Sequence, residues 1–157
     1  VLIAAIVLIA VGYAAISNIT LTISGTASGE GSNNNFKVLF TGTPSGSTIT
    51  GQGTASGSIN TEHSAEMTVS GLTTNGDSAS VTFDVKNEST DIYADVAVTA
   101  GSSEPSGDFT ITTTGGGTSI APGATTTVTV TVTLNKTLIE SSSTNINVSL
   151  VASPSTM

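Results

Sequence analysis

The single imidazole of the chain, His63, lies between Glu62 and Glu66 in the segment NTEHSAE. A histidine beside carboxylates is the composition of a metal site or of a general base. One isolated histidine among polar residues is more typical of a surface loop, and we interpret His63 in this way.

The other patterns that support catalysis are missing from the sequence. The chain has no Cys and no G-x-S-x-G segment, so it offers neither a thiol nucleophile nor a nucleophile elbow. Its Asp residues do not follow the alternating spacing of a calcium-binding loop. The sequence therefore predicts a protein that is not an enzyme and that needs no metal or cofactor.

Four asparagines carry the N-x-S/T spacing at which N-linked glycans are attached: Asn18, Asn87, Asn135 and Asn147. Asn147 alternates with Ile146 and Val148, and we expect it on the solvent face of a strand. Asn135 continues a series of outward threonines and is also expected to be exposed. N-linked glycans are predicted in a host that makes them, and the Thr-rich strand faces offer sites for O-linked glycans.

Composition limits the remaining classes of function. The 157 residues suit one compact body, and Ser and Thr make up about a third of them. Three Lys, no Arg and a net charge of -8 exclude the basic surface that nucleic-acid binding requires. A disulfide scaffold is excluded because there is no Cys.

From residue 18 onward, apolar and polar residues alternate with the period of two that is typical of half-buried strands. The clearest example is TTTVTVTVTLN over 125–135, and SASVTFDVKN over 78–87 follows the same pattern. Residues 42–61 are rich in Gly, Ser and Thr, and we expect an irregular hairpin there. Gly, Pro and Asn separate the strands. We predict a mostly β fold in which 18–157, called the body below, form an antiparallel Ig-like β-sandwich.

Residues 1–17, called the apolar segment below, begin with VLIAAIVLIAVGYAAI and carry no charge. We predict a single hydrophobic α-helix, which at 1.5 Å per residue is too short to cross a ~30 Å hydrocarbon core comfortably. Its length suits the core of a filament, although a plain membrane anchor and a donor strand remain as alternatives. The predicted polymerisation residues are Val1, Leu2, Ile3, Ala4, Ala5, Ile6, Val7, Leu8, Ile9, Val11 and Gly12.

An apolar run at the very start of the chain resembles the mature N-terminus of type IV pilins and of archaeal flagellin-like filament subunits. In those proteins a prepilin-type peptidase cuts ahead of the run, and the apolar helices of many copies pack as the filament core. The resemblance implies a homo-oligomeric helical filament whose subunits reside in the membrane before assembly.

A second resemblance rests on GYAAISNITLTISGTA, NGDSASVTFDVKNES and APGATTTVTVTV. These segments look like those of the TasA/camelysin-type surface proteins, with Tyr13, Ala14 and Ala15 matching a Tyr-Ala-Ala junction. The resemblance implies an extracellular fibre of β-sandwich subunits.

These observations together predict a secreted structural subunit of a cell-surface filament, which polymerises through its apolar segment and exposes its β-sandwich as an outer shell. One alternative is a membrane-anchored adhesin or binding module. The other is a TasA/camelysin-like fibre subunit that assembles by donor-strand exchange.

Overall fold

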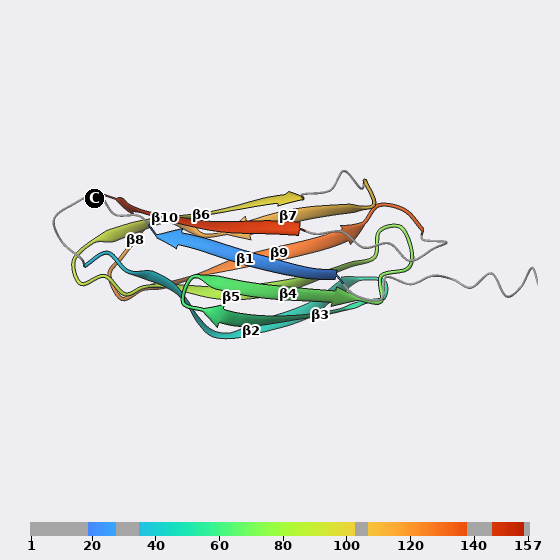
Figure 1. Ribbon diagram of the computed structural model, residues 1–157, viewed down its shortest axis with the longest axis horizontal. Helices are drawn as coiled ribbons and strands as arrows, with labels where there is room; N and C mark the ends of the chain where they lie inside the picture. The colour runs from blue at the N-terminus through green and yellow to red at the C-terminus, as the bar shows by residue number, and fades with distance from the viewer. Residues whose placement is uncertain (1–18, 28–34, 103–106, 138–145, 156–157) are drawn as a thin grey trace, which may run out of the picture.

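The computed structural model describes residues 19–27, 35–102, 107–137 and 146–155, and these residues form ten strands and no helix (Figure 1). The strands are β1 (Ile19–Ala27), β2 (Val38–Thr50), β3 (Thr54–Thr61), β4 (Ser64–Ser70), β5 (Ser78–Asn87), β6 (Tyr93–Ser102), β7 (Phe109–Gly115), β8 (Gly117–Ile120), β9 (Thr125–Leu134) and β10 (Ile146–Ser155). The prediction of a mostly β body is confirmed for these residues. The predicted helix over 1–17 lies outside them.

The strands form two sheets. One has six strands in the order β3-β4-β1-β10-β6-β8, and the other has four in the order β2-β5-β9-β7. Every pair is antiparallel, as predicted, except β1 and β10, which run parallel. Parallel neighbours cannot be joined by a tight turn, and here the rest of the body connects them because they are the first and last strands.

The alternation of β5 and β9 sets the register of the four-stranded sheet. Their ladder runs without a shift from Ser78↔Thr133 to Lys86↔Thr125. Val81, Phe83 and Val85 of β5 and the alternating residues from Val128 to Leu134 of β9 are buried against the other sheet. The residues between them, such as Thr82, Asp84 and Thr131, are only partly buried. A slip by one residue would turn the valines of β9 outward, which explains the continuous ladder.

Residues 42–61, expected as an irregular hairpin, form most of β2 and all of β3. The two strands belong to different sheets, and the β2–β5 register shifts between Thr41 and Ser45. Because the chain passes from one sheet to the other at residues 51–53, these two strands lie beside each other and close one side of the molecule.

Another of the passages between the sheets, from β7 to β8, takes place at residues 115–117, which are all glycine. Gly116 has a φ of 81°, and a side chain there would collide with the carbonyl oxygen of Val96. The short strand β8 that follows was not expected from the sequence, because four residues without alternation carry no strand signal.

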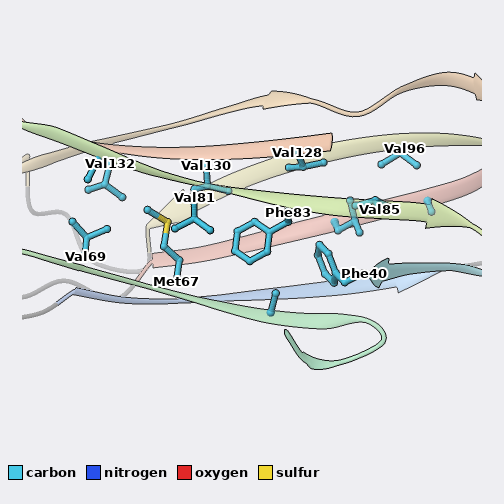
Figure 2. Packing of buried hydrophobic residues seen from close by; sticks show 14 of the residues in the cluster. Phe40, Met67, Val69, Val81, Phe83, Val85, Val96, Val128, Val130 and Val132 are labelled. Carbon is cyan, nitrogen blue, oxygen red and sulfur yellow. The ribbon is translucent and has the colours of Figure 1, made fainter. Parts of the chain in front are cut away.

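Both sheets contribute to a single core (Figure 2). The rings of Phe40 and Phe83 pack with their centroids 5.8 Å apart at an angle of 59°. The largest fully buried side chains are Phe83, Met67, Leu72, Leu134, Val38, Val69 and Val81. These side chains stay out of water only if neither sheet has a gap. β1 lies between β4 and β10, so it closes the six-stranded sheet over the core.

Candidate functional site

The predicted polymerisation residues, from Val1 to Gly12, lie outside the described residues. Among the described residues there is no helix that is long and apolar enough to span a bilayer. What the structure does describe is the strand that directly follows the apolar segment, namely β1.

β1 occupies the middle of the six-stranded sheet. It pairs with β4 through six residues, from Ile19↔Val69 to Ser24↔Ser64, and with β10 through seven, from Leu21↔Ile146 to Ala27↔Ala152. Among the described strands, β1 is the one that joins β3–β4 to β10–β6–β8. Without it, the backbone hydrogen-bonding groups of two strands would be left open along their length.

The neighbours of β1 carry a large part of the core. Ala65, Met67 and Val69 of β4 have no exposed surface, and Leu150 and Ala152 of β10 are buried. A gap between β4 and β10 would admit water to these side chains. The strand attached to the apolar segment is therefore also the strand that completes the sheet over the core.

The parallel pairing of β1 with β10 separates the first residue of β1 from the last residue of β10. β1 begins beside the start of β10, and it ends beside Ala152, three residues before the end of β10 at Ser155 (Figure 1). The chain therefore enters the body at one end of the β1–β10 pair and leaves it at the other.

Two buried polar side chains, Asp77 and Asn87, bracket β5. Asp77 stands immediately before the strand and is 6% exposed. Its Oδ2 accepts hydrogen bonds from the backbone amides of Thr73 and Thr74, both at 2.9 Å, and the amide of Gln52 also donates to the carboxylate. The carboxylate thus ties the β2–β3 turn to the β4–β5 loop.

Two opposing effects act on the pKa of Asp77. Loss of hydration raises the pKa, while the hydrogen bonds from Thr73, Thr74 and Gln52 lower it, and the net result is a pKa below the ordinary value. The ionised carboxylate is therefore the form that the fold prefers.

Asn87 closes the other end of β5 and has no exposed surface. Its Nδ2 donates to the carbonyl oxygens of Ile92 and Ile120, each at 2.9 Å, and its Oδ1 accepts from the amide of Ser89 at 3.0 Å. Both amide hydrogens are used, so a glycan on Asn87 would replace these bonds. The side chain serves to join three segments of the fold.

The other predicted glycosylation sites differ in their surroundings. Asn135 is exposed; its amide donates to the carbonyl of Gly107 at 3.1 Å and accepts from Thr110 at 2.9 Å. Asn18 lies outside the described residues. Asn147 belongs to β10, but its side chain is not among those that the structure describes.

The carboxylates beside His63 have other partners. Glu62 lies 3.4 Å from the ammonium of Lys37, and Glu66 accepts from Asn60 at 3.4 Å. His63 itself is exposed, and its backbone amide donates to Thr61. In the described part of the chain, no three His, Cys, Asp or Glu side chains are grouped as metal ligands would be.

All three lysines form ion pairs. Lys37 and Lys86 both contact Glu88, at 3.1 and 3.3 Å, and Lys136 lies 2.7 Å from Asp108. The hydrogen bond between Lys37 and Glu88 is the main cause that raises the pKa of Lys37 and lowers that of Glu88. The lysine side chains of these pairs are 38–56% exposed, and water and salt screen them, so the pairs contribute little to stability.

Sequence reasoning missed the structural roles of Asp77 and Asn87. A signal for Asn87 was present, because it shares the parity of Val81, Phe83 and Val85, which are inward-facing in β5. For Asp77 the only signal was its place in an Asn-Gly-Asp turn before a strand. Neither signal predicts which distant backbone groups form hydrogen bonds with the side chains of Asp77 and Asn87.

The lowered pKa of Asp77 predicts a loss of stability in acid. The ionised Asp77 contributes its full stabilisation of the folded state above the ordinary carboxyl pKa. This contribution is lost as the pH falls through the lowered pKa of the folded state, because the unfolded chain binds the proton more tightly than the folded chain does. In Asp77→Asn this part of the acid dependence should be absent, and the variant should be less stable at about pH 7, where the ionised carboxylate is missing. Urea unfolding across the acid range measures both effects. Asp91→Asn is the matched control at an exposed position, and an equal loss in both variants would contradict the assigned role.

A second prediction concerns Asn87. Asn87→Ala removes the donor to the carbonyls of Ile92 and Ile120 and the acceptor of the buried Ser89 amide, and a buried group left without a partner costs about 1–3 kcal/mol. Asn135→Ala removes the same side chain at an exposed site, where water replaces its bonds. Chemical denaturation should therefore separate the two variants clearly, with Asn87→Ala the less stable. Similar midpoints would show that the Asn87 network is dispensable.

Neither a protein-family model nor a curated protein matches this chain. The resemblances to pilins and to TasA/camelysin-type proteins therefore stand on the quoted segments alone.

Proposed function

We propose that this chain is a structural subunit of an extracellular filament, held together by its apolar segment and with the body as the outer shell. The body is assigned to the Ig-like sandwiches, an assignment supported by two facing sheets over one core and by a chain that passes repeatedly from one sheet to the other. Before assembly the subunit resides in the membrane through the apolar segment.

The observation that carries the proposal is the direct connection between the apolar segment and β1. Ile19 is the first residue of β1, one residue beyond Asn18 and two beyond the apolar segment. A segment that bonds subunits together must transmit load to the body that it carries. Here it continues into a strand with ladders on both sides rather than into an edge strand or a loose tether.

The apolar segment supplies the affinity that assembly requires. Burying one Val, Leu or Ile side chain contributes about 1.5–3 kcal/mol, and the segment holds three Val, two Leu and four Ile. Small residues such as Ala5 and Gly12 allow backbones to approach closely, as they do between membrane helices.

The outer surface of the body suits an exposed shell. The outer faces of β7 and β9 carry threonines, including Thr110, Thr112 and Thr127, which are exposed. In a host that attaches N-linked glycans, Asn135 is the described sequon whose side chain is exposed. Glycans at such sites would add to the hydrated surface.

The position of β1 between β4 and β10 supports a second mode of assembly, donor-strand exchange. Donor-strand exchange would place β1 of one subunit between β4 and β10 of the next, in the register seen here within one chain. The filament would then be continuous through its sheets as well as through the apolar segment.

Electron microscopy of sheared cell-surface material tests the proposal. Fibres that contain this chain are expected in the wild type. They should be lost in Ala5→Leu and Gly12→Leu, because larger side chains keep the segments apart, while the secreted body stays folded. Ile9→Leu is the control that preserves apolar volume and should still assemble. Recovery of the chain only from detergent-solubilised membranes would instead support the membrane-anchored adhesin.

A disulfide distinguishes the two modes of assembly. Thr22 and Glu66 are directly opposite each other in the β1–β4 register, and the chain has no other Cys, so Thr22→Cys with Glu66→Cys introduces one defined pair. After oxidation of the fibres, donor-strand exchange gives covalent ladders on a non-reducing gel. Intact monomers indicate that each subunit keeps its own β1.

A further inference from the structure

We propose that β1 and β10 form a mechanical clamp: tension between the residues before Ile19 and the C-terminal end of β10 is carried as shear along this parallel pair. The inference deepens the proposed function, on which the origin of the load rests. The clamp itself follows from the register and does not depend on whether the chain polymerises.

The direction of loading follows from the parallel register. Leu21 lies opposite Ile146 and Ala27 lies opposite Ala152, with no shift between them. The first residues of β1 and the last residues of β10 are therefore at opposite ends of the pair, as Figure 1 shows. Pulling on these two ends draws the strands past each other along their length and does not peel them apart.

Shear loads the backbone hydrogen bonds of a ladder together, whereas peeling loads them one after another. A single hydrogen bond adds only about 0.5–1.5 kcal/mol to stability, so the number that must break at once decides the resistance. β1 pairs through seven residues with β10 and through six with β4. β10 is held by ten further pairs with β6. Neither strand can slide without breaking a ladder on each of its sides.

Side-chain burial opposes sliding as well. A slip of β10 by one residue would turn Leu150 and Ala152, which are 4% and 2% exposed, toward solvent, and would bring the exposed Val151 inward. The pair β6–β8 offers a contrast in the same sheet, because it is restricted to Ala94↔Ile120 and Val96↔Gly117 with a shift between them. The resistance is therefore concentrated where the chain enters and leaves the body.

Single-molecule force spectroscopy on the full chain tests the clamp. The chain has no Cys, so paired cysteines define the pulling points. Ser17→Cys with Thr156→Cys loads β1 and β10 in shear. Ser17→Cys with Thr144→Cys keeps the first handle and moves the second to the other end of β10, which changes the loading to peeling. All three positions lie outside the residues that the structure describes, and equal urea midpoints establish that both variants are folded alike.

The shear pair should unfold at a force about twofold or more above that of the peeling pair at the same loading rate, because its hydrogen bonds are loaded together. Equal forces in the two geometries would overturn the proposal, and so would a weaker shear pair. The measurement uses single chains, so a failure to form filaments leaves its result unchanged. Conversely, filaments from a chain without the force difference would contradict the clamp but not the proposed function.

Discussion

The six-stranded sheet is held together through one strand. Its two halves, β3–β4 and β10–β6–β8, share no pairing with each other except through β1 among the described strands. The backbone groups of β4 and β10 that face β1 cannot be satisfied elsewhere without water entering the core beside Met67 and Leu150. The integrity of the sandwich and the attachment of the apolar segment thus depend on the same hydrogen bonds. A force on the apolar segment would reach the body through the hydrogen bonds of β1 with β4 and β10.

The second sheet is organised around β5, whose two ends are fixed by buried polar side chains. Asp77 accepts hydrogen bonds from three backbone amides, while Asn87 donates to two carbonyls and accepts from one amide. A carboxylate suits a place where only donors converge, and a carboxamide suits one where donors and acceptors meet. These networks, rather than the exposed ion pairs of the lysines, connect the loops at the two ends of the sandwich.

Much of this architecture could be predicted from local sequence, because a period of two identifies both a strand and its buried face. The inward valines of β9 and the inward face of β5 are examples. The parallel pairing of β1 with β10 could not be predicted, since partners so far apart in sequence leave no local signal. The strand β8 was missed because it is short and irregular. Asn87 carries the spacing of a glycosylation sequon, yet it shares the parity of the inward residues Phe83 and Val85 in β5. That parity predicts the inner face for its side chain, but not the distant backbone groups that the side chain contacts.

The central claim is that β1 is an integral strand of the body, and amide hydrogen exchange of the full chain tests it most directly. If β1 joins the two halves of its sheet, the amides of Leu21, Thr22 and Ile23 that are bonded to β4 or β10 should exchange only through global unfolding, as slowly as the amides of β5 and β9. Exchange of these β1 amides at the rate of a fraying terminus, with β4 and β10 still protected, would contradict the account.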